Sequence, residues 1–299
     1  MDILWALESI RTPFLDVLIT LITRLGEEMI LIVVFCALFW CICKRKAYVV
    51  GIVFFFSAII VQGMKITFRV DRPWVYDPTF TTVTGAEGTA TSYAFPSGHT
   101  QAAAAYLMPL GVMLRKWKAV MIVLFTLALL VGFSRMYLGV HYLSDVLMSY
   151  VIVGIVMFLA LKLYYDAPES KKNNVLFPLI ILVAAAVLLV MVAVMNNAGV
   201  TAASELRDSV LAAGAAAGFS IGMYIEQRYI NFSVKSKNIW IHILKFVLGL
   251  AGTVGIMEGA RILGSGLVAD GIRYGLMTLW ITAVYPLIIK RFLAVKTEN

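Results

Sequence analysis

Residues 47–73 read AYVVGIVFFFSAIIVQGMKITFRVDRP and join a long apolar run to a cluster of positive charge. Residues 47–64 carry no charge, and a run of ~20 apolar residues is long enough to cross the hydrocarbon core of a bilayer. Lys65, Arg69 and Arg72 then follow, ahead of Pro73, which ends a helix because it lacks an N–H donor. The stretch predicts a transmembrane helix with a basic end.

The rest of the chain repeats this apolar character. Hydrophobic residues make up 61% of the 299 residues and charged residues only 14%. The apolar runs are continuous and do not alternate with polar residues, which favours helices over a β-barrel. We therefore predict an all-α polytopic transmembrane bundle of about nine spans. The predicted spans are 27–43, 47–66, 98–114, 117–135, 144–165, 175–195, 207–225, 240–258 and 271–289.

Residues 1–26 are apolar but interrupted. The interruptions are Glu8, Arg11, Pro13 and Asp16. Such a pattern is typical of an amphipathic helix that lies in the membrane interface, where Trp5 would serve as an anchor. A tenth span is the alternative interpretation.

The basic residues predict an orientation. Sixteen of the 25 Lys and Arg residues fall on one side of the predicted bundle, and the positive-inside rule makes that side cytoplasmic. These residues are Lys44, Arg45, Lys46, Arg115, Lys116, Lys118, Lys162, Lys171, Lys172, Arg228, Lys235, Lys237, Lys245, Lys290, Arg291 and Lys296. We expect a multi-pass protein of the cell membrane with its amino terminus outside and its carboxyl terminus inside. Anionic lipid headgroups explain the net charge of +8, and we predict no nucleic-acid partner.

The opposite, outer face collects polar residues that orientation does not explain. Lys65 and Arg72 are seven residues apart, so both point the same way if the helix continues beyond the membrane. Arg135 ends a predicted span on the same face. His141 and Asp145 are four residues apart, and one helical turn would place the carboxylate beside the imidazole. We expect Asp145 to fix the tautomer of His141 and to favour its imidazolium form.

The heptapeptide AFPSGHT, residues 94–100, opens the predicted span 98–114 on that face. Pro96 and Ser97 suit the first turn of a helix, and Gly98 lets a ligand approach the backbone closely. Free N–H groups at a helix start attract anions. With three basic side chains nearby, the expected anion is a phosphate, and His99 would stand beside its oxygens.

Together these residues resemble the signature of the type 2 phosphatidic acid phosphatase (PAP2) superfamily. The signature is K-x6-R-P, then P-S-G-H, then S-R-x5-H-x3-D. All eleven of its fixed letters occur here in order and at the right spacing. The matching residues are Lys65, Arg72, Pro73, Pro96, Ser97, Gly98, His99, Ser134, Arg135, His141 and Asp145.

The resemblance implies a membrane phosphatase that needs no metal and no cofactor. His141 would attack phosphorus to form a phosphohistidine, and Asp145 would orient and charge-balance it. His99 would protonate the leaving oxygen. The phosphate oxygens would be held by Lys65, Arg72, Ser97, Gly98 and Arg135. Residues 27–165 would then form the catalytic helical core, and residues 166–299 a four-span extension.

The substrate and the reaction stay open at this stage. A lipid phosphate or diphosphate is the first expectation, such as phosphatidic acid, phosphatidylglycerol phosphate or a polyprenyl diphosphate. The span count also resembles the layout of glucose-6-phosphatase, which keeps a sugar phosphate as an alternative. A lipid phosphotransferase and a non-catalytic phosphate-lipid transporter are further alternatives. The sequence predicts no oligomeric state.

The extension carries two patterns of its own. Gly214, Gly218 and Gly222 recur every fourth residue, which predicts a close approach by a neighbouring helix, and Gly255 and Gly259 repeat the spacing. The charged residues Glu205, Arg207 and Asp208 at one span end are interpreted as interfacial ion pairs.

Overall fold

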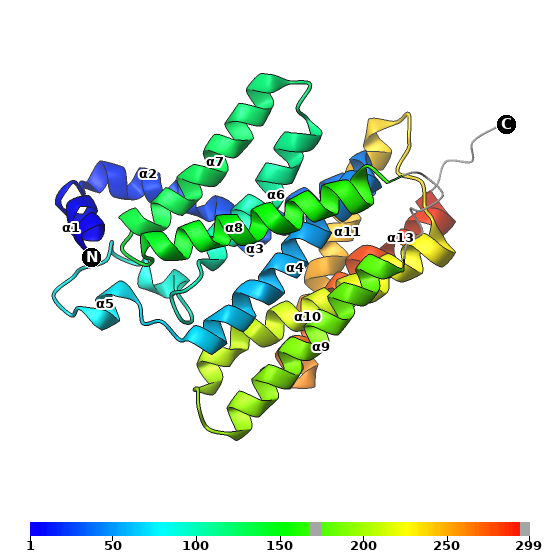
Figure 1. The fold of residues 1–299 in the computed structure, drawn as a ribbon. Helices are drawn as coiled ribbons and strands as arrows, with labels where there is room; N and C mark the ends of the chain where they lie inside the picture. Colours follow the sequence, from blue (N-terminus) through cyan, green and yellow to red (C-terminus); the bar gives the residue numbers. More distant parts are fainter. Residues whose placement is uncertain (168–174, 294–299) are drawn as a thin grey trace.

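A computed structural model describes residues 1–167 and 175–293, and every regular element in these two ranges is helical. The helices of the amino-terminal half are α1 (Asp2–Ser9), α2 (Pro13–Thr23), α3 (Glu28–Ala37), α4 (Lys44–Phe68), α5 (Pro73–Tyr76), α6 (Gly98–Met113), α7 (Lys118–Tyr137) and α8 (Leu143–Ala160). Those of the carboxyl-terminal half are α9 (Leu176–Asn197), α10 (Ala203–Ile225), α11 (Ile239–Gly259), α12 (Leu267–Leu279) and α13 (Tyr285–Ile288). The predicted all-α class is confirmed (Figure 1).

Seven helical segments in the described ranges are long and apolar enough to cross a membrane. They are Lys44–Tyr76, Lys118–Tyr137, Leu143–Tyr165, Leu176–Asn197, Ala203–Ile230, Ile239–Leu263 and Leu267–Phe292. An eighth results if the pair Pro13–Gly26 and Glu28–Ile42, bent by 51°, forms one span. The chain is thus a multi-pass membrane protein, but the predicted nine spans are not confirmed. One reason is that α6 has 16 residues, fewer than the ~20 of a full span.

The amino-terminal segment contains two helices where the sequence predicted one. Thr12 caps α2 by accepting from the N–H of Leu15, and Pro13 takes the first helical position. Arg11 donates from Nε to the carbonyl of Tyr137 at 3.0 Å and from Nη1 to that of Thr81 at 2.7 Å. The segment therefore packs against the turn that follows α7. Its place in the membrane interface remains a prediction.

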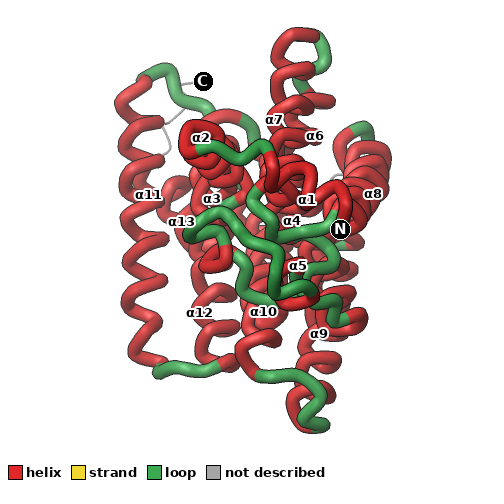
Figure 2. The backbone as a smooth tube through the Cα atoms, turned by 90° about the vertical axis from the view of Figure 1, so that its left-hand side faces the viewer, coloured by secondary structure: helices red, strands yellow, loops and turns green. Residues whose placement is uncertain are grey.

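Helix α4 runs through the centre of the bundle and joins its two halves. It packs against α6 and α8 on one side and against α9 and α10 on the other (Figures 1 and 2). At the amino-terminal end of α4, the carboxylate of Glu226 accepts from Lys44 Nζ at 2.8 Å and from the hydroxyl of Tyr48. At the other end, the loops between α4 and α6 gather over α1 and α5 on the face turned to the viewer in Figure 2.

Close packing of α10 on α12 confirms the first glycine pattern. A Cβ at Gly214 would lie 2.1 Å from the carbonyl oxygen of Gly271, and one at Gly218 would lie 2.1 Å from that of Gly275. The two backbones touch because neither helix has a side chain there. The second pattern was misread, since a Cβ at Gly255 or Gly259 would meet nothing within 4 Å.

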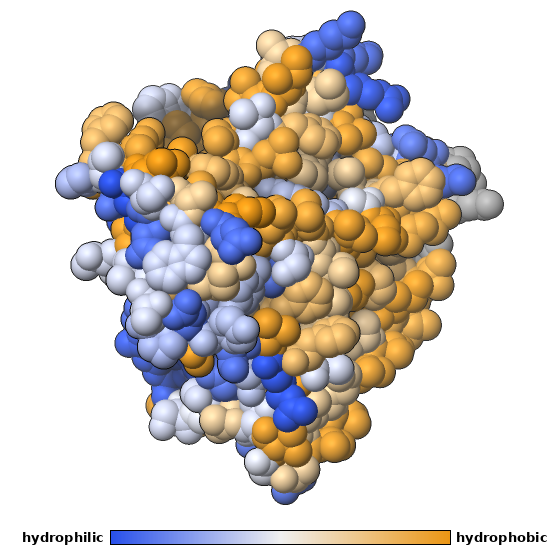
Figure 3. Space-filling view, turned by 60° about the vertical axis from the view of Figure 1, so that its left-hand side comes forward, coloured by the Kyte–Doolittle hydropathy of each residue, from blue (hydrophilic) through white to orange (hydrophobic). Residues whose placement is uncertain are grey.

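The surface has the polarity of a membrane protein. Figure 3 shows hydrophilic side chains on the left-hand side and again at the upper right, with apolar surface between them. Of the basic residues assigned to the inner side, Lys171, Lys172 and Lys296 lie outside the described residues.

The glycine contacts yield a stability prediction. Gly218→Ala should lower the free energy of unfolding by about 1–3 kcal/mol, because its methyl group meets backbone that must move. Gly255→Ala is the matched control, and its open site should leave stability unchanged or slightly raised. Thermal or denaturant unfolding of both variants in detergent measures the difference. Equal stability of the two variants would refute the packing argument.

Candidate active site

The side chains of Lys65 and Arg72 lie in the same site although the helix that carries Lys65 ends before Arg72. Helix α4 stops at Phe68, and Arg69 takes a left-handed conformation with φ 49° that turns the chain back. The expectation that the helix continues to Arg72 is therefore wrong. The two side chains share Ser92 instead: Lys65 Nζ donates to its Oγ at 3.3 Å, and Arg72 Nε donates to its carbonyl at 2.7 Å. Both cations are buried.

The second motif opens α6 as predicted. Ser97 is the N-cap, and its Oγ accepts from the N–H of Thr100 at 3.4 Å and from Thr100 Oγ1 at 2.9 Å. Its own N–H donates to the carbonyl of Asp145 at 3.1 Å, and its carbonyl accepts from Ser149 Oγ at 2.9 Å. Ser97 thereby ties the start of α6 to the start of α8.

The third motif places His141 just before α8. The carboxylate of Asp145 accepts from the backbone N–H of Tyr142, the N-cap, at 2.8 Å and lies 3.2 Å from His141 Nδ1. Both side chains are buried. The predicted contact between carboxylate and imidazole is therefore confirmed, although His141 precedes the helix and does not lie within it.

Arg72 contacts the other nitrogen of the same ring. Its Nη1 lies 3.0 Å from His141 Nε2 and donates to the carbonyl of Val140 at 2.9 Å. A guanidinium can only donate, so Nε2 must be the unprotonated acceptor and Nδ1–H must point to Asp145. Burial, reinforced by the positive charges of Arg72, Arg135 and Lys65, holds the pKa of His141 well below its usual range. The ring contacts and the lowered pKa therefore favour a neutral His141 over the expected imidazolium form.

Arg135 reaches the site from α7 and is fully buried. Its Nη1 donates to Thr23 Oγ1 at 2.9 Å and its Nη2 to Thr89 Oγ1 at 3.0 Å. Its Nε has no partner among the described residues. The sequence indicated Arg135 but missed the two threonines that hold it, because they lie far away in the chain and carry no motif.

A cavity of about 470 Å³ unites most of these groups. Five of the eight predicted site residues line it: Lys65, Arg72, Gly98, His99 and His141. Ser97, Arg135 and Asp145 are not among the lining residues and contact the groups that are. The ring of His99 makes no hydrogen bond with any residue that the structure describes, so its nitrogens are free for a ligand.

The extension also contributes to this cavity, which the sequence did not indicate. Arg207 and Asp208 line it from α10, and Glu28 lines it from α3. Arg207 forms an ion pair with Asp270 at 2.8 Å, a partner that the sequence did not indicate, while Asp208 accepts from Thr91 Oγ1 at 2.5 Å. The position of Arg207 and Asp208 at the start of a span was the only feature of the sequence that could have indicated their place in the cavity. Within the described ranges, no three His, Cys, Asp or Glu residues are grouped as metal ligands.

Buried basic side chains lie beside a histidine–carboxylate pair inside a membrane-spanning bundle, and this arrangement defines a multi-pass protein with a candidate site for an anion. Residues 45–170 match the model of the PAP2 superfamily, and residues 210–297 match that of the PAP2 superfamily phosphatase transmembrane extension. The chain belongs to the PAP2 superfamily of phosphatases.

Two curated relatives each align with about half of this chain. Phosphatidylglycerophosphatase B of Bacillus subtilis is 30% identical over 172 residues, which cover 51% of this chain and 76% of the relative. Undecaprenyl-diphosphatase of Sulfolobus acidocaldarius is 26% identical over 164 residues, which cover 54% and 77%. The crystal structure of a transmembrane PAP2-type phosphatidylglycerolphosphate phosphatase from Bacillus subtilis covers 53% of this chain and 81% of its own, with 29% identity and a TM-score of 0.46.

The ring contacts predict the protonation state of His141. The chain has three histidines, so ¹⁵N-histidine NMR gives few signals, and His99→Gln and His141→Gln variants assign them. We expect His141 to be neutral, protonated at Nδ1, and to stay so well below the usual histidine pKa of ~6.5, because its pKa is lowered. Titration of this ring at or above pH ~6.5 would contradict the assigned geometry.

Proposed function

We propose that the protein hydrolyses a lipid phosphate or lipid diphosphate through a phosphohistidine formed on His141. The observation that carries this proposal is the line Asp145–His141–Arg72, in which the unprotonated Nε2 faces a cationic cavity. An oxygen of the incoming phosphate accepts the hydrogen bond that Arg72 otherwise donates to Nε2. The released lone pair of Nε2 then lies next to phosphorus.

The first step forms a bond between Nε2 and phosphorus and breaks the bond from phosphorus to the lipid oxygen. Burial and the nearby basic side chains hold the pKa of His99 well below its usual range, so this ring gains its proton from the bound phosphate group. It gives that proton to the lipid oxygen as the oxygen leaves. The Nδ1–H of His141 remains hydrogen-bonded to Asp145, whose negative charge balances the phosphoimidazolium. Lys65, Arg72, Arg135, Ser97 and the N–H of Gly98 hold the remaining phosphate oxygens as charge builds.

The second step returns the enzyme to its starting state. His99, now neutral, takes a proton from a water molecule, which attacks phosphorus from the side of the departed lipid. The bond to Nε2 breaks, and phosphate leaves. Neither step routes through a metal ion, because the three basic side chains already supply the positive charge.

Three observations support a lipid as the substrate. The site lies at the ends of membrane-spanning helices, and the cavity continues between them. The names of both curated relatives refer to phosphate or diphosphate lipids. A water-soluble sugar phosphate gains nothing from apolar walls, whereas a hydrocarbon chain is removed from water there.

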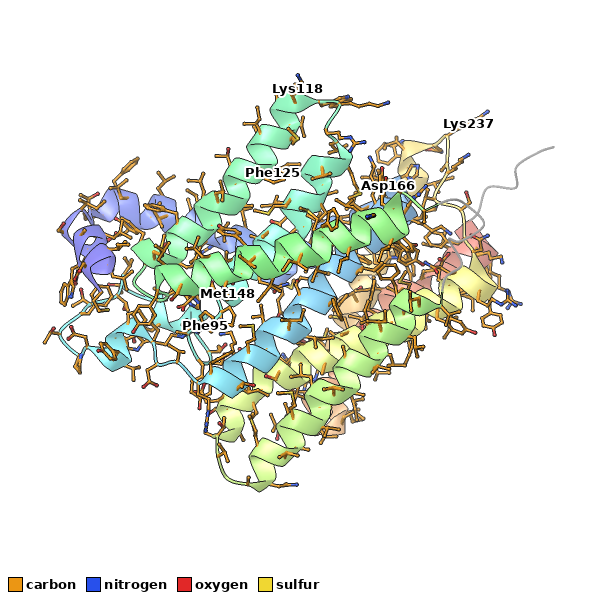
Figure 4. The ribbon with its side chains drawn as sticks, in the orientation of Figure 1. Phe95, Lys118, Phe125, Met148, Asp166 and Lys237 are labelled. Atoms are coloured by element: carbon orange, nitrogen blue, oxygen red, sulfur yellow. The ribbon has the colours of Figure 1, made fainter. Side chains whose placement is uncertain are left out.

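We further propose that the protein resides in the cell membrane with the site on the outer face. Lys118, Asp166 and Lys237 lie toward the upper and right-hand side of the molecule in Figure 4, and Phe95 lies at the left, near the site. The basic loops thus share one side, which the positive-inside rule assigns to the cytoplasm.

Phosphate release by the purified protein tests the reaction. Wild-type protein should hydrolyse phosphatidic acid, phosphatidylglycerol phosphate or a polyprenyl diphosphate in the presence of EDTA. His99→Gln should lose ~10²-fold or more of this activity, and less with p-nitrophenyl phosphate, whose leaving group needs little protonation.

Two outcomes would overturn the proposal: complete loss of activity in EDTA with recovery on adding a divalent metal, or an equal loss on both leaving groups. The same assay on intact cells reads the orientation. External p-nitrophenyl phosphate should be cleaved without lysis, and activity that appears only after lysis would place the site inside.

A further inference from the structure

The cavity is far deeper than a phosphate group requires. Along α4 its lining runs from Lys65 back to Val50, fifteen residues away, or about 22 Å at the ~1.5 Å rise of a helix. Along α10 it runs from Arg207 to Phe219. One leaflet of the hydrocarbon core is roughly 15 Å thick, half of ~30 Å. The cavity thus extends past the depth of a single leaflet.

The extension provides about a third of the lining residues. Helices α3 and α4 form one side, and α10 and α12 form the other. The deep lining residues are mainly apolar: Leu31, Phe35, Val50, Phe54, Phe55, Ala58, Leu211, Ala212, Ala215, Phe219, Met277 and Ile281. Contact between the glycines of α10 and α12 fixes these two helices relative to each other.

Three polar residues of the deep lining are bonded to protein, whereas Gln62 Oε1, nearer Lys65, has no partner among the described residues. Thr278 Oγ1 donates to the carbonyl of Ala215 at 2.8 Å, and Thr282 Oγ1 donates to that of Thr278 at 2.6 Å. Gln101 Nε2 donates to Ser57 Oγ at 2.7 Å. Water in this part of the cavity finds few donors or acceptors, whereas a hydrocarbon chain meets suitable surface.

An aromatic cluster closes the inner end. Phe219 packs on Gly51 so closely that a Cβ there would lie 2.5 Å from its ring. The ring of Phe219 also stacks on Phe55 with centroids 4.6 Å apart, and it meets the edge of Phe35 at 6.0 Å. On α10 the lining ends at Phe219, and we call this aromatic cluster the floor of the cavity.

We propose that α10 and α12 complete a chamber for one hydrocarbon chain of the lipid substrate, and that Phe219 sets the longest chain it accepts. The volume of about 470 Å³ lies within the ~300–1,000 Å³ of pockets that take one small ligand. The charged residues at the mouth, including Arg207 and Asp208, surround the headgroup, and the chain points toward the floor. This inference rests on the proposed function and assigns the extension a role in substrate selection.

Chain-length dependence of turnover tests the chamber. The substrates are single-chain lysophosphatidic acids from hexanoyl to oleoyl in one fixed detergent, with p-nitrophenyl phosphate as the chainless reference. In wild type, kcat/KM should rise with chain length up to a limit. Ala212→Phe places a ring in the chamber and should lower the ratio of long-chain to chainless kcat/KM by about tenfold, through overpacking that a bound chain must displace.

Two more variants keep this test independent of folding. Phe219→Leu lowers the floor and should move the limit to longer chains, a gain that damaged protein does not produce. Ala186→Phe adds the same ring to the exposed face of α9, outside the cavity lining, and should keep the wild-type ratio.

The outcomes separate the two proposals. Hydrolysis of lysophosphatidic acids with the same chain-length profile in wild type, Ala212→Phe and Phe219→Leu would overturn the chamber and leave the phosphatase intact. Absence of phosphate release from every lipid phosphate would overturn the proposed function itself.

Discussion

The hydrogen bond between Asp145 and His141 is the constraint on which the site depends. A buried carboxylate and a buried imidazole are both costly to keep away from water unless each finds a partner. The N–H of Tyr142 and His141 Nδ1–H satisfy Asp145, and Arg72 satisfies His141 Nε2. This chain of contacts leaves one protonation state for the ring, in which the lone pair of Nε2 accepts from Arg72, and both residues line the cavity.

The surrounding fold holds this line in place from several directions. The start of α6 bonds to the start of α8 through Ser97, and the amino-terminal segment holds the turn after α7 through Arg11. Thr23 and Thr89 fix Arg135. These bonds are made at the ends of helices, where backbone groups are free to accept them. The bundle therefore acts as a rigid frame around a site made of helix ends and loops.

Local physics explains what the sequence predicted. The long apolar runs predicted the helical class, since this follows from periodicity. The four-residue spacing of His141 and Asp145 predicted their contact, which forms although His141 precedes α8. Span count was less predictable because α6 is short and α2 and α3 bend as a pair. The turn at Arg69 was also not predicted. Its left-handed conformation is rare outside glycine and asparagine, and an arginine at this position does not indicate it.

Features that depend on tertiary structure were beyond the sequence. Arg207 and Asp208 lie more than sixty residues from the last signature residue, yet they line the same cavity. The glycine spacing of α10 predicted a close helix neighbour but not which one. The neutral state of His141 depends on burial and on Arg72, whereas the spacing to Asp145 alone suggested the charged form.

Location of the covalent phosphate tests the central claim most directly. Wild-type protein is quenched by denaturation during turnover of a substrate with radiolabelled phosphate and digested with trypsin, which separates the two histidines because Arg115 and Arg135 lie between them. We predict an acid-labile label on the peptide that contains His141, absent from His141→Ala and still formed by His99→Gln with p-nitrophenyl phosphate. Label on His99, or turnover by His141→Ala at the wild-type rate, would contradict the account.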